Sequence, residues 1–488
     1  MRPQAVLSRQ SEANLVLFNA RILTMDLARP RAEWVVVSEG RIREVGDGGG
    51  YRGHLGRGTR SIDCGGRTLL PGFHDAHCHI LGLASRLMAL DCGQDKAPSI
   101  AKIKDLVRRQ AGDTTEGRWV RAFGYDEALL AEGRHPNRRD LDEAAPSHPV
   151  RLEHRTGHGV VLNSLAMSML GIGRNTEDPP EGMIERDESG EPTGVFLEMS
   201  SYIGKLMAPY RRREEMEEGV RRVDGLLLSR GVTSVQDAGW ENGLERWETL
   251  YDYKQRGLPT PRVTMMVGWR HAVEMEGMGL GPGVEAGGLR VGAAKFMLTL
   301  TTGALHPPMG ELREAALDLH NRGWQLAFHA VEREAVEAAA EVIGYVQSRK
   351  LRPGARHRIE HVSECPPSTL AKVKASGAVV VTQPGFIWHN GDRYLRLVGR
   401  EMLPNLYPLR SLTEEGIRWA ASSDAPVIEP DPLLDIYAAV SRRTVGGGVV
   451  GERESVGVEE AVRAWTLGGS YVGLQDGLLG SVQVGKAG

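Results

Sequence analysis

The sequence has few cysteines, and none of them form a paired motif. Its 488 residues include only four cysteines, and no two of these stand in a CxxC arrangement. A disulfide framework is therefore not expected. This cysteine usage is typical of a reducing compartment.

The sequence also lacks long apolar runs and an excess of one charge. No stretch approaches the ~18 apolar residues that a membrane helix needs, and the N-terminal residues MRPQAVLSRQSEANLVLF resemble no secretion signal. Lys and Arg number 60 against 63 Asp and Glu, so the formal net charge is −3. This balance argues against a nucleic-acid surface or a polybasic membrane patch. We expect a cytoplasmic protein with no nucleic-acid or membrane partner.

Short apolar runs alternate with helix-like segments along most of the chain. In the segment 310–322, for example, apolar residues recur at helical spacing and a glycine follows. Eight strands separated by helices predict an α/β fold, the (β/α)₈ TIM barrel, with a buried parallel sheet. The predicted strands are 69–79, 232–239, 261–267, 291–298, 324–330, 357–363, 378–384 and 418–425.

Two regions do not belong to a minimal barrel. Residues 14–24 and 33–46 are short β-rich runs split by polar turns, and they predict a small β module before the barrel. A long insertion separates the first two barrel strands. It has its own helix, with Ser99 as N-cap, and strands near 118–123 and 149–154.

The stretch FHDAHCH concentrates possible metal ligands at the end of the first predicted strand. Residues i and i+2 of a strand share a face, so His77 and His79 point one way and Cys78 the other. Asp75 shares the histidine face one step deeper, and we expect it to orient a ligand histidine. Two such histidines alone can also merely line a polar pocket.

Other strand ends carry matching residue types. His329, His361 and Asp424 end later strands, and Lys295 lies within an apolar run, where a charge is costly unless it is paired or modified. Taken singly, His329 can be a satisfied core histidine and Asp424 a helix cap. Because barrel active sites lie at the carboxyl ends of the strands, the joint pattern favours one metal site.

The sequence resembles the amidohydrolase superfamily, specifically the YtcJ-like metal-dependent hydrolases of the amidohydrolase-3 group, which includes N-substituted formamide deformylase. The resemblance spans nearly the whole chain, including the long insertion. The matching stretches are LLPGFHDAHCHI, RHPNRRDLDEAAPSHPVRLEHRTGHGVVLNS, GEPTGVFLE, GVTSVQDAG, VGAAKF, LAFHAV, RHRIEHVS, VVVTQP and ASSDAPV.

This resemblance implies a barrel with a small β-sandwich formed from both chain termini. We expect residues 1–68 to be the N-terminal part of the sandwich. Residues 69–430 would be the metallo-hydrolase barrel, with the insertion at about 93–220. Residues 431–488 would hold the last barrel helices and a remnant of the sandwich, whose C-terminal strands look truncated.

The resemblance also implies a chemistry. A divalent metal, expected to be zinc, would bind as one or two ions per chain, and a carbamate on Lys295 would bridge two ions. A metal-activated hydroxide would then cleave a non-peptide C–N bond, an amide or formamide, of a small-molecule substrate. Asp424 would serve as both metal ligand and catalytic proton carrier. The implied metal-site residues are His77, His79, Lys295, His329, His361 and Asp424.

Substrate contacts and the oligomeric state are weaker expectations. His158 of the insertion, and Trp388 and Tyr394 after the seventh strand, are candidate substrate-binding residues, although aromatic loop residues more often pack locally. The stretch KFMLTLTTGALHPP departs from the family pattern and alters the substrate side of the fourth strand. A homodimer is a family expectation.

Two alternatives stay open. A mononuclear deaminase of the same superfamily carries an acid/base glutamate in an H-x-x-E pattern, and Glu332 stands at that spacing after His329. A non-catalytic assembly protein of this fold normally lacks the metal ligands, whereas this chain has residues of the right type at all six positions.

Overall fold

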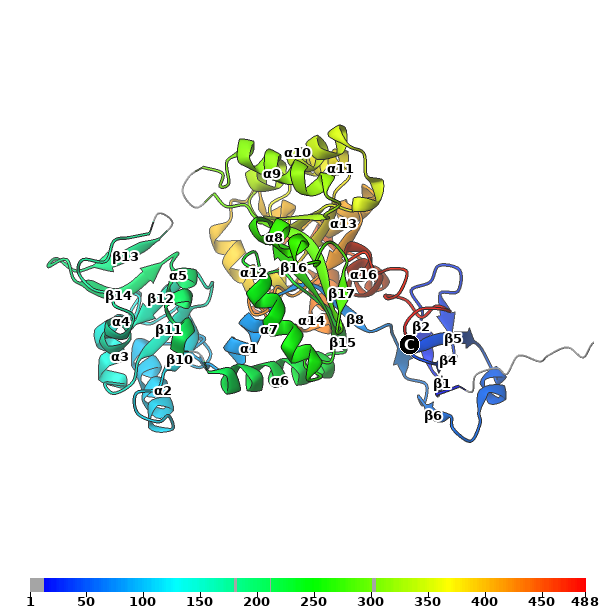
Figure 1. The fold of residues 1–488 in the computed structure, drawn as a ribbon, viewed down its shortest axis with the longest axis horizontal. Coiled ribbons are helices and arrows are strands. Elements are labelled where there is room, and N and C mark those ends of the chain that lie inside the picture. Colours follow the sequence, from blue (N-terminus) through cyan, green and yellow to red (C-terminus); the bar gives the residue numbers. More distant parts are fainter. Residues whose placement is uncertain (1–12, 180–181, 211, 301–303) are drawn as a thin grey trace, which may run out of the picture. The chain divides into compact units, whose positions relative to one another are not determined.

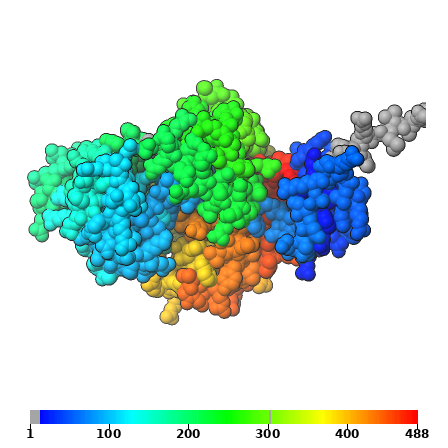
Figure 2. Space-filling view, turned by 90° about the horizontal axis from the view of Figure 1, so that it is seen from below, coloured from blue at the N-terminus to red at the C-terminus, as the bar shows by residue number. Residues whose placement is uncertain are grey.

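The computed structural model describes residues 13–179, 182–210, 212–300 and 304–488, and the described chain divides into two compact units (Figure 1). The barrel unit comprises Met1–Cys78, Leu227–Asp424 and Pro430–Gly488. The insertion unit comprises His79–Leu226 and Ala425–Glu429. Figure 2 gives the space-filling view of the chain coloured by residue number.

Eight parallel strands form the centre of the barrel unit, in the same order as along the chain. Each of the eight strands predicted from the sequence is present, so the (β/α)₈ prediction is confirmed. Their shared carboxyl edge is where the candidate metal ligands gather. The strands are β8 (Phe73–Cys78), β15 (Val232–Asp237), β16 (Arg262–Gly268), β18 (Leu289–Met297), β19 (Leu326–Ala330), β20 (Arg358–His361), β21 (Val379–Thr382) and β22 (Trp419–Ala421).

The first and last strands of the barrel meet through the residues that follow them. The Asp424 N–H donates to the His77 carbonyl oxygen at 2.8 Å, and the Ser423 N–H donates to the Asp75 carboxylate at 3.1 Å. Among the described residues, β8 and β22 form no strand ladder with each other. The barrel is therefore nearly closed, with a seam between its first and last strands.

Helices follow the strands and cover the parallel sheet, as a buried sheet requires. The predicted helix at 310–322 is α9, and Gly323 after it adopts a φ of 101° that favours glycine. The helices of this unit are α7 (Leu244–Gln255), α8 (Ala272–Gly277), α9 (Met309–Asn321), α10 (Arg333–Arg349), α11 (Pro367–Ser376), α12 (Gly385–Leu397), α13 (Leu409–Glu414), α14 (Pro432–Ser441), α15 (Val458–Arg463) and α16 (Gly469–Val472).

Two small sheets precede the barrel, in the region predicted as a β module. One has the order β5-β4-β1-β6 and the other β3-β2-β7, and the apolar residues Ile22, Val35 and Ile42 form a core with Val482 from the C-terminal region. The strands are β1 (Leu15–Phe18), β2 (Arg21–Leu23), β3 (Arg31–Ala32), β4 (Trp34–Ser38), β5 (Arg41–Gly46), β6 (Arg60–Asp63) and β7 (Thr68–Leu69).

The C-terminal residues lie along the edge strand β5. The Ile42 N–H donates to the Lys486 carbonyl and the Gly485 N–H donates to the Ile42 carbonyl, both at 2.8 Å. Only the Arg41–Ala487 pair forms a β-bridge there, so this segment contributes packing to the sheet region without being a strand.

The insertion unit contains a mixed sheet with the order β13-β14-β12-β11-β10-β9. The predicted N-cap is present, because Ser99 accepts a hydrogen bond from the Lys102 N–H at 3.2 Å. The strands are β9 (Leu90–Asp91), β10 (Val120–Tyr125), β11 (Val150–His154), β12 (Gly159–Leu162), β13 (Met183–Arg186) and β14 (Pro192–Leu197). The helices are α1 (Ile80–Leu87), α2 (Ile100–Gly112), α3 (Arg138–Ala144), α4 (Ser164–Met169), α5 (Ser200–Leu206) and α6 (Arg213–Ser229).

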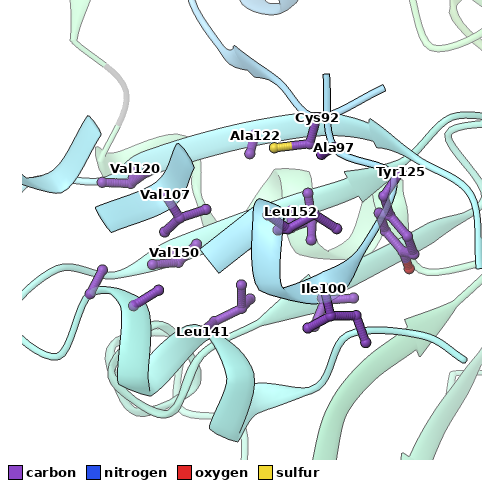
Figure 3. Close-up of a cluster of buried hydrophobic side chains, with 14 of the residues drawn as sticks. Cys92, Ala97, Ile100, Val107, Val120, Ala122, Tyr125, Leu141, Val150 and Leu152 are labelled. Atoms are coloured by element: carbon purple, nitrogen blue, oxygen red, sulfur yellow. The ribbon is translucent and has the colours of Figure 1, made fainter. Parts of the chain in front are cut away.

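One face of this sheet packs on α2 and α3 through a tight apolar cluster. Leu152 on β11 is fully buried (Figure 3). It belongs to one apolar cluster with Ile100 and Val107 of α2 and Leu141 of α3. The insertion therefore has a hydrophobic core of its own. In the described part of the chain, no helix combines the length and apolar character needed to cross a bilayer.

Replacing the buried Leu152 by Ala should destabilise the insertion unit. Loss of a fully buried leucine side chain costs about 2–5 kcal/mol, because apolar contacts vanish and a cavity remains. Limited proteolysis and thermal unfolding of the full chain would measure the effect. The matched control is Met183→Ala, since Met183 is exposed on the edge strand of the same sheet. Equal stability of the two variants would contradict this description of the core.

Candidate metal centre

Three of the predicted ligands converge at the carboxyl ends of the first and last barrel strands. His77 lies on β8, His79 directly follows this strand, and Asp424 follows β22. Ligand atoms of the three side chains all lie within 4.8 Å of one another. Asp424 has a φ of 55°, a left-handed conformation rare for a non-glycine residue and frequent at functional sites.

His361 and His329 extend this group across the barrel. The His361 ring centroid lies 4.9 Å from that of His77 and 4.4 Å from that of His329. His361 has a φ of 71°, which ends the regular alternation of β20 and turns its ring out of the strand pattern. Both His361 and Glu360 can therefore approach the same imidazole, that of His77.

Lys295 lies on β18, close to the same group. It is 2% exposed, and its ammonium nitrogen has no hydrogen-bond partner among the described residues. Burial lowers the Lys295 pKa to about 8, and the nearby carboxylates of Glu360 and Asp424 partly oppose that shift. An unpartnered buried amine is costly unless something else at the site compensates it.

The hydrogen bonds of two histidines fix which ring nitrogen carries the proton. The His77 Nδ1 lies 2.6 Å from a Glu360 carboxylate oxygen, and the His361 Nδ1 lies 2.8 Å from the Gln383 amide oxygen. Since both partners are acceptors, each Nδ1 carries the proton and each Nε2 presents a lone pair.

These lone pairs fit a metal ion. The His77 Nε2 lies 3.5 Å from an Asp424 carboxylate oxygen, and the His361 Nε2 is buried without a hydrogen-bond partner among the described residues. Burial, and next the charge of Lys295, lower the His77 pKa to about 3, so this imidazole is neutral at physiological pH. Neutral imidazoles beside a carboxylate are a typical donor set for a divalent transition metal.

The buried ion pair of Arg358 and Glu360 holds the His77 ring. The sequence analysis assigned no role to either residue. Arg358 donates to both carboxylate oxygens of Glu360, to the Gln236 side-chain oxygen at 2.6 Å and to the Ala76 carbonyl at 2.7 Å. Burial alone would raise the Glu360 pKa, but the charge of Arg358 holds it well below the usual value. The sequence does contain a signal for this pair, because Arg358 and Glu360 are opposite charges at i and i+2 of an otherwise apolar strand.

The structure gives Asp75 a different role from the predicted one. Its carboxylate accepts from the Ser423 hydroxyl at 2.5 Å, from the Ser423 N–H and from the His77 backbone N–H, and burial raises its pKa to about 6. Glu360, not Asp75, orients the His77 ring. Asp75 instead fixes the backbone that leads into Asp424.

The predicted substrate-binding residues are not brought together by the described contacts. Trp388 on α12 packs edge-to-face on Tyr437, and the Tyr394 hydroxyl lies 3.0 Å from that of Tyr407. His158 belongs to the insertion unit, where its Nδ1 lies 2.8 Å from a Glu198 carboxylate oxygen. Their substrate role stays a prediction. Residues 301–303, in the stretch that departs from the family pattern, lie outside the described residues.

Glu332 is the residue directly before α10, and no described hydrogen bond or ion pair joins it to His329. The H-x-x-E alternative stays open.

Residues 60–488 match the amidohydrolase family. The chain belongs to this family. N-substituted formamide deformylase from Arthrobacter pascens is 28% identical, over 97% of this chain and 92% of that protein. YtcJ from Bacillus subtilis (strain 168) is 24% identical, over 92% and 88%. A crystal structure described as an uncharacterized metal-dependent hydrolase from Pyrococcus horikoshii OT3 shares the fold, with a TM-score of 0.79 and 23% identity over 97% and 95% of the chains.

In this amidohydrolase, Glu360→Gln should weaken metal binding. The change removes the carboxylate that fixes the His77 tautomer, and loss of such a partner typically costs 10–100-fold in metal affinity. Zinc affinity of the full chain can be measured by competition with a chromophoric chelator, with thermal unfolding recorded separately because Arg358 loses its buried counter-charge. The control is Glu341→Gln, on the surface of α10. Unchanged zinc affinity in a folded Glu360→Gln protein would rule out the orienting role.

Proposed function

We propose that this amidohydrolase is a metal-dependent hydrolase that cleaves a non-peptide C–N bond, an amide or formamide, in a small molecule. The observation that carries the proposal is the pair of imidazoles, His77 and His361, whose protonated Nδ1 atoms are held by acceptors. The His77 Nε2 lies 3.5 Å from an Asp424 carboxylate oxygen, and the His361 Nε2 is buried without a hydrogen-bond partner among the described residues.

The residues proposed to hold the metal are those gathered at the carboxyl edge of the barrel sheet. Imidazole nitrogens with carboxylate oxygens suit zinc well, and several other first-row ions less selectively. When bound, such an ion supplies Lewis acidity and makes water a nucleophile near neutral pH. The set is His77, His79, Lys295, His329, His361 and Asp424, enough for one or two ions.

Asp424 is the proposed proton carrier of the reaction. Its carboxylate lies at the strand end beside the His77 Nε2 and is 8% exposed, so it reaches the site without being freely solvated. A carboxylate in this position can take the proton of the attacking water and pass it to the leaving nitrogen. The amine then departs in a neutral form.

Lys295 is proposed to carry a carbamate when two ions bind. Its amine is buried at the site and has no hydrogen-bond partner among the described residues, so a compensating group is expected there. Addition of CO₂ to the neutral amine forms an N–C bond, releases one proton and converts the side chain into an anion. That anion offers two oxygen ligands.

The relatives support one substrate class for the proposed reaction. N-substituted formamide deformylase covers nearly the full length of both chains, which supports an N-formyl or N-acyl amine as the first substrate class to examine. The H-x-x-E spacing of His329 and Glu332 keeps the mononuclear deaminase as the alternative.

The proposal predicts chelator-sensitive hydrolysis that depends on Asp424. Zinc-loaded protein should hydrolyse members of a panel of N-formyl amines, N-acyl amines and cyclic amides. Asp424→Asn should lower kcat/KM by about 10²–10⁴-fold, the usual contribution of general acid–base catalysis, or more if metal is lost. The control is Asp113→Asn, an exposed position after α2.

Release of product amine measured by liquid chromatography, with the metal content of each protein, completes this test. A zinc-loaded wild-type protein inactive on the whole panel would overturn the proposed reaction. Ammonia release from aminopurine-type substrates instead would identify the deaminase alternative. A protein that binds no metal would point to the non-catalytic assembly role.

A second prediction addresses the Lys295 carbamate. Lys295→Ala should bind one zinc ion fewer and lose activity, and a short carboxylic acid such as formate or acetate should restore part of both by filling the vacated position. Lys372→Ala, a surface lysine on α11, is the control. If Lys295→Ala retains the wild-type zinc content and gains nothing from added carboxylate, the bridging carbamate is excluded.

A further inference from the structure

A second group of candidate metal ligands lies wholly within the insertion unit. β10 and β11 are parallel neighbours, and Tyr125 at the end of β10 pairs with His154 at the end of β11 (Figure 1). Asp126 and Glu127 follow immediately after β10. Figure 3 shows Tyr125 at the end of the strand away from Val120. The carboxyl ends of parallel strands are where open α/β sheets commonly bind ligands.

The side chains that follow these strands converge on one point. Asp126, Glu127 and His154 offer ligand atoms that all lie within 4.8 Å of one another. The Glu127 Oε2 lies 3.0 Å from the His154 Nε2. Both atoms are buried, yet neither makes a hydrogen bond within the described part of the chain, so the short contact between them is not aligned for one.

The other ring nitrogen of His154 is engaged. Its Nδ1 lies 2.8 Å from the Thr156 hydroxyl and 3.3 Å from the Thr156 N–H. Because a backbone N–H can only donate, the Thr156 N–H donates to Nδ1, and the proton of the neutral ring lies on Nε2, facing Glu127. An ion at Nε2 would move this proton to Nδ1, where the Thr156 hydroxyl can accept it.

The site carries the negative charge of two carboxylates, and neighbouring residues hold its side chains in position. The Asp126 Oδ1 accepts from the Ala128 N–H at 3.1 Å, and its Oδ2 lies 3.6 Å from the Arg155 Nε. His135, whose Nδ1 lies 2.9 Å from the Tyr125 hydroxyl, packs edge-to-face on Tyr125. The Arg155 guanidinium thus stands beside Asp126, while the His135 Nδ1 lies 3.7 Å from the Glu127 Oε2.

We propose that Asp126, Glu127 and His154 form a binding site for a divalent first-row transition ion, with zinc as the probe, separate from the barrel centre. Two carboxylate oxygens and one imidazole nitrogen are a recognised donor set for such ions, and three protein ligands leave a position for water. The ion would join the loop after β10 to the end of β11 and so order this edge of the insertion sheet.

A simple Glu127–His154 ion pair explains the same residues less well. A charged pair requires a proton on the His154 Nε2 directed at the carboxylate, and the two atoms approach without that alignment. An ion shared by the two atoms needs no such alignment.

The test uses metal-free full-length protein titrated with Zn²⁺ against a chromophoric chelator. Glu127→Gln and His154→Gln should each bind one equivalent fewer than the wild type, or bind that equivalent at least about tenfold more weakly, since loss of even an outer-shell partner costs 10–100-fold. Glu116→Gln, an exposed carboxylate of the same unit, should match the wild type.

Hydrogen exchange with and without Zn²⁺ locates the ion independently of activity. Zinc should protect the segments 120–136 and 150–157 in the wild type but not in the two variants, while protection around His77 and Asp424 stays the same in all three. If a variant fails to fold by circular dichroism, Asp126→Asn takes its place. Equal stoichiometry and affinity in wild type and variants, or zinc protection confined to the barrel, would overturn the site.

Discussion

The candidate centre depends on a single buried ion pair. Arg358 and Glu360 are both fully buried, and they lie two residues apart on β20. Taking two charges out of water is costly unless further hydrogen bonds satisfy them. Here Arg358 is satisfied by Gln236 and by the Ala76 carbonyl, and Glu360 by the His77 ring. The Glu360 carboxylate, whose charge would destabilise the barrel interior if it had no partners, is thus hydrogen-bonded to the His77 imidazole.

This arrangement ties three barrel strands to one ring orientation. Gln236 belongs to β15, Ala76 to β8 and Arg358 to β20, so the ion pair connects strands that are distant in sequence. A change in the position of any of these strands would alter the hydrogen bonds of Arg358 and, through Glu360, the direction of the His77 Nε2. Rigid support of this kind is what a ligand set needs, because metal affinity falls quickly when the ligand orientation is loose.

Much of this fold could be predicted from the sequence because each buried parallel strand is a compact apolar run bounded by turns. The helix before Gly323 was readable from apolar spacing in the same way. The position of His361 at a strand end was also readable, but the direction of its ring was not. Strand alternation sets His361 on the face opposite to Glu360, whereas its positive φ accompanies a ring that lies against His77.

The side-chain network around His77 and the second group of candidate ligands could not be predicted from the sequence. Which carboxylate orients His77 depends on how the strands pack across the barrel, and the choice between Asp75 and Glu360 could not be made from spacing. Likewise, Glu127 and His154 become neighbours only because β10 and β11 pair in parallel. Sequence gives residue types at strand ends, whereas tertiary pairing decides which ends meet.

The seam between β8 and β22 has a thermodynamic consequence. The two strands are held by a backbone bond from Asp424 to His77 and by the Asp75–Ser423 contact in place of a ladder. An ion shared by His77 and Asp424 would close a loop that spans almost the whole barrel sequence. Because the two ligands meet only in the folded barrel, the ion would stabilise the folded state by mass action and would be released on unfolding. Metal binding and barrel unfolding would then be thermodynamically linked.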